Sequence, residues 1–134
     1  WALHEELLQN CTDLWDSLGI HYEIVNICTG DMGTVAAKKY DLEAWIPGAN
    51  QYKEIVSCSN CTDYQANRLS IRYGQPGHPN QPIVHTLNST AVATSRALVA
   101  IMEQNQLEDG RVSIPQVLQP FMGGQTVLEP CQWG

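Results

Sequence analysis

Polar side chains that could bind a metal–nucleotide complex gather in one short stretch, Tyr52–Cys61. A carboxylate, two hydroxyls and an amide fall within seven residues there, from Glu54 to Asn60. A buried polar group needs a partner, so a strand that carries this many is a candidate site. The pattern predicts an alternating strand that ends as a polar turn containing Cys58 and Cys61 and leads into a short helix.

Glu54 is the candidate metal–nucleotide ligand of this stretch. On a regular strand it would share a face with Tyr52 and Val56, and Ser57 would lie on the other face. A lone strand glutamate is more often simply solvated. The apolar neighbours of Glu54 and the adjoining turn favour the binding role.

Arg96 is the candidate anion ligand. It is the single charged residue between Leu87 and Met102, inside an expected helix. Most such arginines pair with a carboxylate nearby in the sequence, but Arg96 has none. The guanidinium fork matches the oxygens of a phosphate group.

The Cys58-x-x-Cys61 pair raises a competing hypothesis, a zinc or redox module. A structural zinc site needs four ligands, and the sequence has no second cysteine pair and only scattered histidines. A redox pair usually opens a helix after a parallel strand. Buried structural thiols are the simpler interpretation, and Gly30–Gly33 is too short and acidic to be a phosphate cradle.

The elements around these residues predict an α+β fold, an antiparallel sheet flanked by helices. Strands follow one another without helix-length crossovers, and short turns join them. Asn88–Thr90 is expected to cap the second long helix, whose buried face is marked by Val92, Leu98, Ile101 and Met102. The expected helices are 3–18, 63–68, 91–106 and 115–121, and the expected strands are 20–28, 40–46, 52–57, 69–73, 83–87 and 111–114.

Composition narrows the function classes. The 134 residues suit one domain, and the net charge of −7 argues against broad, non-specific nucleic-acid binding. No apolar run reaches the roughly 20 residues of a membrane span. Five cysteines fit reduced thiols in a cytoplasmic protein. The first residue is Trp1, inside an expected helix, so we expect a piece of a longer protein.

The chain closely resembles the seryl-tRNA synthetases, which are class II aminoacyl-tRNA synthetases. The resemblance rests on motifs along nearly the whole chain, in matching order and separation. They are Thr29–Gly33, Tyr40–Glu43, Tyr52–Arg68, His85–Arg96, Asp109–Gly110 and Pro115–Gly124.

The resemblance implies a ligase that activates L-serine with ATP and Mg²⁺ and transfers the seryl group to tRNA(Ser), with tRNA(Sec) as a further acceptor. By resemblance Glu54 holds Mg²⁺–ATP, Ser57 is the neighbouring ATP-site hydroxyl, and Arg96 is the motif 3 arginine. Asn88 and Thr90 resemble serine-pocket residues. A site that hydrogen-bonds the serine hydroxyl can reject alanine strongly.

The resemblance also implies what these residues lack. Residues 1–134 correspond to the C-terminal half of a catalytic domain. Motif 1 with its homodimer contacts, most of motif 2 and the coiled-coil arm are expected upstream. We therefore expect this chain alone to be inactive. Asn67 stands where the family often has a second basic residue beside Arg68. The rival function is a non-catalytic paralogue with a structural or tRNA-binding role.

Overall fold

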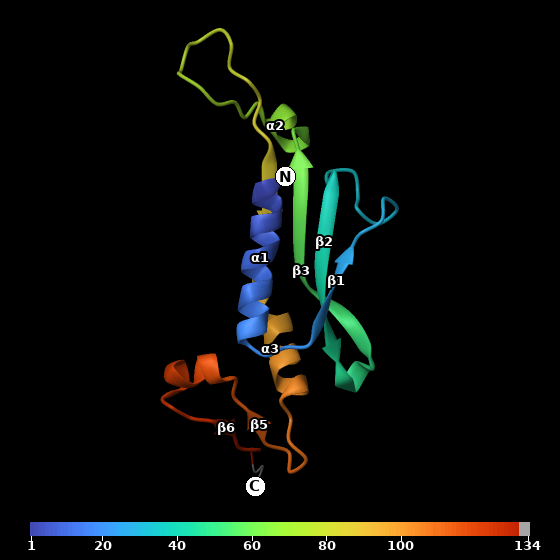
Figure 1. Cartoon of the computed structure of the whole chain (residues 1–134), viewed down its shortest axis with the longest axis vertical. Coiled ribbons are helices and arrows are strands. Elements are labelled where there is room, and N and C mark those ends of the chain that lie inside the picture. The colour runs from blue at the N-terminus through green and yellow to red at the C-terminus, as the bar shows by residue number, and fades with distance from the viewer. Residues whose placement is uncertain (132–134) are drawn as a thin grey trace.

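The computed structural model describes residues 1–131 (Figure 1). Four strands form the main sheet, and two long helices lie beside it. In chain order the elements are α1 (Ala2–Ser17), β1 (Tyr22–Asn26), β2 (Lys38–Ile46), the 3₁₀ helix η1 (Pro47–Ala49), β3 (Gln51–Thr62), α2 (Tyr64–Leu69), β4 (Thr86–Ser89), α3 (Thr94–Gln104), β5 (Val112–Ser113), the 3₁₀ helix η2 (Gln116–Met122) and β6 (Val127–Leu128).

The main sheet has the order β1-β2-β3-β4, and every neighbouring pair is antiparallel. The turn from β2 to β3 passes through η1 and ends at Asn50, whose φ of 49° is left-handed. Asparagine tolerates that conformation better than most residues, which suits a tight return of the chain. The predicted α+β fold with an antiparallel sheet is confirmed.

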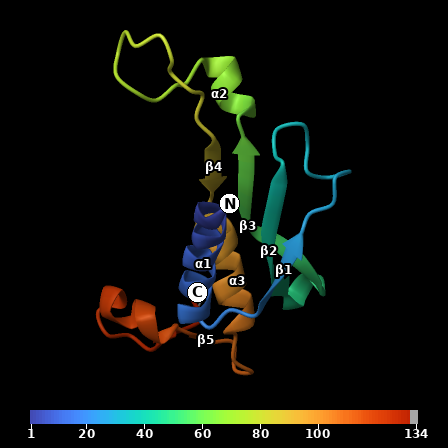
Figure 2. The same cartoon turned by 45° about the horizontal axis from the view of Figure 1, so that its top comes forward.

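Both long helices pack on one face of the sheet, side by side in Figures 1 and 2. Alternation along β2 explains this, since Leu42, Ala44 and Ile46 are buried while the residues between them face the other way. The core joins them to residues of both helices and of β3. Its buried members are Cys11, Trp15, Leu18, Ile20, Leu42, Ala44, Ile46, Ile55, Val56, Ala97 and Ala100.

The spacing of Leu3, Leu7, Cys11, Leu14 and Leu18 predicts a buried stripe on α1, and the observed stripe differs from it. Cys11 and Leu18 are buried as predicted, but Leu3 is 65% exposed. His4 and Trp15 take the central places, both fully buried. His4 stacks on Tyr40 and its Nε2 contacts the Cys58 carbonyl at 3.1 Å, so a polar ring fills this part of the core.

The strand β3 is longer than predicted. It continues to Thr62, so Cys58 and Cys61 belong to the strand and not to a turn. The predicted polar turn at these cysteines was wrong. Pairing with β4 explains the difference, because Cys58 lies opposite Ser89 and Thr62 opposite Thr86. Backbone hydrogen bonds across the sheet outweigh the turn preference of a Ser-Asn pair.

The predictions for the start of α3 and for most of its buried face were also wrong, although Ile101 does pack against the core. Asn88 and Ser89 belong to β4, and the helix starts after Ala93 without a side-chain cap. Its buried residues are Ala97 and Ala100, whereas Leu98 is 61% exposed. Small alanines let the helix approach the sheet closely, which turns the larger apolar side chains outward.

The remaining segments agree in part with the prediction. The expected strand 69–73 is a loop with one bridge, between Arg72 and Ile83, and the strand expected at 83–87 is β4, Thr86–Ser89. The loop between α2 and β4 extends away from the sheet (Figure 1). Within residues 1–131, none of the helices combines the length and apolar character that crossing a bilayer requires.

Candidate functional site

A β-bulge in β3 places Glu54 and Ser57 on the same face of the sheet. Leu42 pairs with Val56 and Glu43 with Glu54, so Ile55 is an extra residue without a partner on β2. Ile55 and Val56 both enter the core. The regular-strand expectation, which separated Glu54 from Ser57, was therefore wrong. Both project from the face opposite the long helices.

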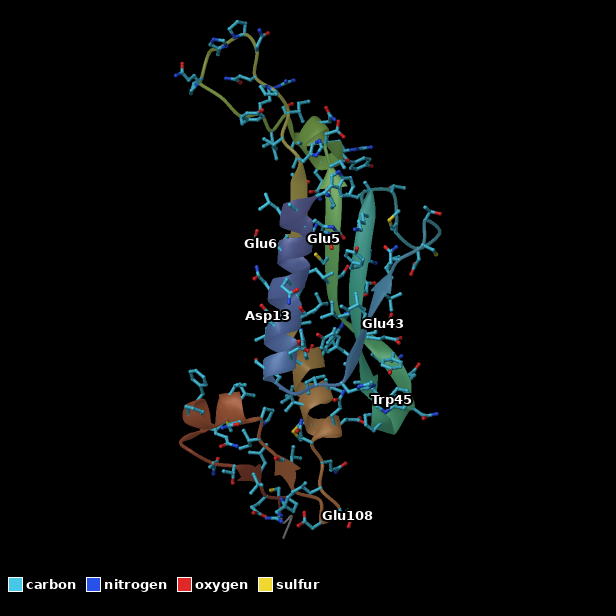
Figure 3. All side chains as sticks on the ribbon, viewed as in Figure 1. Glu5, Glu6, Asp13, Glu43, Trp45 and Glu108 are labelled. Atoms are coloured by element: carbon cyan, nitrogen blue, oxygen red, sulfur yellow. The ribbon has the colours of Figure 1, made fainter. Side chains whose placement is uncertain are left out.

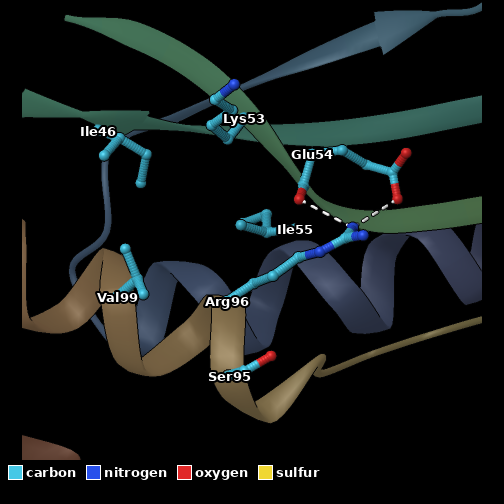
Figure 4. Close-up of a pocket in the computed structure, with 7 residues that line it drawn as sticks. All are labelled: Ile46, Lys53, Glu54, Ile55, Ser95, Arg96 and Val99. Carbon is cyan, nitrogen blue, oxygen red and sulfur yellow. Dashed lines mark hydrogen bonds and ion pairs between the residues drawn. The ribbon is translucent and has the colours of Figure 1, made fainter. Parts of the chain in front are cut away.

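Arg96 reaches Glu54 from the first turn of α3. Its Nη1 donates to a Glu54 carboxylate oxygen at 2.8 Å and to the Glu54 carbonyl oxygen at 3.1 Å (Figure 4). The contact is possible because β4 pairs with β3 only from Cys58 onward. The edge of β3 that precedes Cys58 is thus open to a side chain from α3. Both side chains stay partly exposed, with 55% of Arg96 and 40% of Glu54 accessible.

A pocket of about 480 Å³ adjoins this ion pair. Apolar side chains form most of its wall, and the charged groups lie at its rim (Figure 4). The lining residues are Ile46, Lys53, Glu54, Ile55, Ser95, Arg96 and Val99. Such a mixture suits a ligand that has both a flat apolar part and charged oxygens.

The expected serine-pocket residues lie beside Ser57. Asn88 is opposite Ser59 on β4 and therefore shares the face of Ser57. Its Nδ2 donates to the Cys61 sulfur at 3.5 Å. The backbone N–H of Thr90 donates to the Ser57 carbonyl at 3.3 Å. Both Asn88 and Thr90 are exposed, so their polar groups are accessible to a ligand.

This same face carries a row of carboxylates. Glu23, Glu43 and Glu54 lie directly opposite one another on β1, β2 and β3. Figure 3 shows Glu43 and Trp45 along β2, away from the labelled acidic residues of α1. Burial raises the pKa of Glu43, and the charges of Glu23, Asp41 and Glu54 raise it further. Like charges directly opposite one another on a sheet oppose folding.

Asp41 and Lys39 complete this face, and neither was singled out from the sequence. Lys39 Nζ lies 3.3 Å from Asp41 Oδ2, while Asp41 Oδ1 is buried without a hydrogen-bond partner. The sequence signal was an alternation: Lys39, Asp41 and Glu43 are spaced two apart on a strand whose other residues, apart from Lys38, are apolar or aromatic. The bulge alone decides which β3 residues face them.

The cysteine pair does not form a metal centre in the described part of the chain. Cys58 and Cys61 are free thiols, and residues 1–131 contain no group of three or more candidate ligands that could hold a metal ion. Cys58 faces His4 on α1, whereas Cys61 faces Asn88 on β4. The interpretation as buried packing thiols fits these separate surroundings.

The antiparallel sheet, its helix-covered face and the polar site on its other face are those of a class II synthetase core. Residues 1–105 match the family model described as the tRNA synthetase class II core domain (G, H, P, S and T). The chain belongs to this family.

Within the family, the chain is similar to proteins named for serine. It is 61% identical over 123 residues to a serine–tRNA ligase of Archaeoglobus fulgidus, an alignment that covers 91% of this chain and 27% of that protein. The fold matches the crystal structure of seryl-tRNA synthetase from Pyrococcus horikoshii complexed with ATP, at TM-score 0.93 and 53% identity, covering 98% of this chain and 29% of that one.

A second solved structure gives the same result. It is the cytoplasmic serine–tRNA ligase of Naegleria fowleri in complex with AMP, at TM-score 0.88 and 48% identity, covering 95% of this chain and 30% of that one. The chain thus spans less than a third of the length of each of these three proteins.

Proposed function

We propose that this chain is the C-terminal part of the catalytic domain of a serine–tRNA ligase. The observation that carries the proposal is the contact between Glu54 and Arg96, which lie 42 residues apart, with Ser57 on the same face of β3, in a fold matched closely by an ATP-complexed synthetase. The reaction activates L-serine with ATP and then transfers the seryl group to tRNA(Ser), with tRNA(Sec) as a further acceptor.

The two steps define the charges that the site must handle. In the first, a serine carboxylate oxygen attacks the α-phosphorus of ATP, and the bond to pyrophosphate breaks with its electron pair on pyrophosphate. In the second, a tRNA 3′-terminal hydroxyl attacks the seryl carbonyl, loses its proton to solvent and displaces AMP. Both steps need positive charge at phosphate oxygens.

Arg96 supplies such charge directly. Its guanidinium donates to the Glu54 carboxylate at 2.8 Å. A phosphate group offers the same planar, two-oxygen match as a carboxylate. We infer that Arg96 exchanges the Glu54 carboxylate for a nucleotide phosphate, or packs on the adenine, when ATP binds.

Glu54 and Ser57 fit a magnesium ion. A carboxylate and a hydroxyl oxygen on one face are donors that Mg²⁺ accepts, and the ion, when bound, would neutralise phosphate charge. Glu54 is the expected ligand of the Mg²⁺ carried by ATP, with Ser57 beside it. Asn88 lies opposite Ser59, and the backbone N–H of Thr90 donates to the Ser57 carbonyl. We assign both residues to recognition of the serine substrate.

The assignments for the full-length protein rest on its family membership. We propose that the full-length protein is a cytoplasmic homodimer whose upstream part contributes motif 1, most of motif 2 and the coiled-coil arm. The fragment of residues 1–134 is expected to be inactive alone, because half of the phosphate-binding side chains lie outside it.

The decisive experiment is serine-dependent ATP–pyrophosphate exchange by the full-length protein. Exchange that requires L-serine and is not supported by L-alanine is expected. Glu54→Ala should weaken use of Mg²⁺–ATP more than serine binding, while Asp109→Asn, at an exposed ion pair near β5, should leave exchange unchanged. A full-length protein that binds tRNA but shows no exchange would be the non-catalytic paralogue.

A further inference from the structure

Asp41 is a buried carboxylate with one oxygen left without a partner. Only 4% of the residue is exposed. Its Oδ2 lies 3.3 Å from the Lys39 Nζ, while its Oδ1 has no hydrogen-bond partner. A buried unpaired acceptor is costly, so its persistence at a site needs a reason.

Ser57 is the residue directly opposite Asp41 across the β2–β3 pair. Opposed residues of an antiparallel pair have Cβ atoms about 5 Å apart and project to the same side. A serine hydroxyl is one donor with two acceptor lone pairs. The register therefore puts the Ser57 hydroxyl and the unpaired Asp41 oxygen on the same side of the sheet, although no hydrogen bond joins them in this structure.

The Ser57 hydroxyl and the Asp41 carboxylate are chemically complementary. A hydroxyl that offers its oxygen to a metal ion or to an approaching donor keeps its proton, which must point elsewhere. We propose that Asp41 is a positioning residue: its Oδ1 accepts the Ser57 proton and turns the Ser57 lone pairs toward Mg²⁺–ATP. This inference rests on the proposed nucleotide role of Ser57.

The two oxygens of Asp41 are both required in this arrangement. One accepts from the Lys39 ammonium and the other accepts from Ser57. Asparagine has a single side-chain acceptor, so Asp41→Asn must leave either Lys39 or Ser57 unsatisfied. Replacing Lys39 by Met removes the ammonium, and the side-chain amide oxygen of Asp41→Asn can then accept a hydrogen bond from Ser57.

The test is a double-mutant cycle on the full-length protein, with the dissociation constant of Mg²⁺–ATP measured by calorimetry. Asp41→Asn should weaken binding about 10- to 100-fold, the range for a hydrogen bond to a charged acceptor. In a Ser57→Ala background the same change should alter binding less than about twofold, since the proton that Asp41 accepts is gone. Asp109→Asn is the matched control, and it should bind normally.

The Lys39→Met/Asp41→Asn double variant guards against a folding defect, which thermal denaturation reports separately. We expect it to recover most of the binding lost by Asp41→Asn when Ser57 is present, and to recover none with Ser57→Ala. An equal loss from Asp41→Asn in both backgrounds would mean a merely structural ion pair and would overturn the proposal.

Calorimetry separates this inference from the proposed function. If the unaltered protein binds Mg²⁺–ATP but shows no serine-dependent exchange, the serine assignment is wrong and the cycle still decides the role of Asp41. If the unaltered protein binds no Mg²⁺–ATP, both are wrong.

Discussion

Arg96 binds Glu54 through one guanidinium nitrogen, which donates to both the carboxylate and the backbone carbonyl of the same residue. The two residues proposed to hold opposite parts of Mg²⁺–ATP are thus in direct contact. Because both side chains are about half exposed, this pair adds no more than about 1 kcal/mol to stability. Its significance lies in keeping the site ordered for a ligand.

Arg96→Lys tests that geometry. Lysine keeps the charge but loses the planar fork, so we expect kcat/KM for ATP in pyrophosphate exchange to fall about 10- to 100-fold, while the midpoint of thermal unfolding changes little. Arg111→Lys, at the exposed pair with Asp109, is the matched control and should keep full activity. Equal activity of the two variants would remove Arg96 from the ATP site.

Glu43→Gln should stabilise the protein at neutral pH. The folded-state pKa of Glu43 is raised by burial and by Glu23, Asp41 and Glu54, so ionisation above that pKa opposes folding. The penalty is absent below the unfolded pKa of about 4.3 and grows as the pH rises through the folded pKa.

Urea unfolding measures this difference. The gain from Glu43→Gln should be present at pH 7 and disappear near pH 4. Glu108→Gln, at an exposed residue far from this face, is the control and should show no such pH dependence (Figure 3). A gain that persists unchanged at pH 4 would mean that charge is not its origin.

Trp15→Phe should loosen α1 from the segment before α3. The fully buried indole N–H donates to the Ala91 carbonyl at 3.1 Å, and phenylalanine loses that bond and part of the packed ring. We expect a loss of about 1–3 kcal/mol in the free energy of unfolding. Trp1→Phe, at a residue 67% exposed, should cost less than about 0.5 kcal/mol.

Thiol reactivity should divide the cysteines into two groups. Cys28 and Cys131 are exposed and should react at once with a thiol reagent, whereas Cys11, Cys58 and Cys61 are buried. Burial also raises the pKa of Cys58, which lowers its thiolate fraction. Mass spectrometry after timed labelling distinguishes the groups. Stoichiometric zinc that is lost on Cys61→Ser would instead support a metal site.

Local signals in the sequence were enough to predict some helix ends and tight turns. Gly19, with φ of 68°, follows the end of α1, and Pro47–Asn50 forms the turn between antiparallel strands, both as glycine and proline at these positions predict. These features depend on a few neighbouring residues. Helix ends and tight turns are determined by backbone conformations that glycine, proline and asparagine favour.

The features that the sequence did not predict depend on residues far apart in the chain. The length of β3 follows from pairing with β4, and the inward face of α3 follows from how closely alanines allow it to approach the sheet. The contact of Arg96 with Glu54 joins segments that no periodicity connects. The bulge at Ile55 had one faint signal, two adjacent apolar residues where alternation should continue.

The bulge at Ile55 limits how Glu54 and Ser57 can be transferred to another protein. Glu54 and Ser57 are three residues apart, a spacing that puts side chains together on a helix but on opposite faces of a regular strand. A graft of the pair onto another sheet must therefore keep the bulge at Ile55, which takes up one residue of the spacing. If the same residues paired as a regular strand without the bulge, one of the two oxygen ligands would point into the core, although the sequence motif would be unchanged.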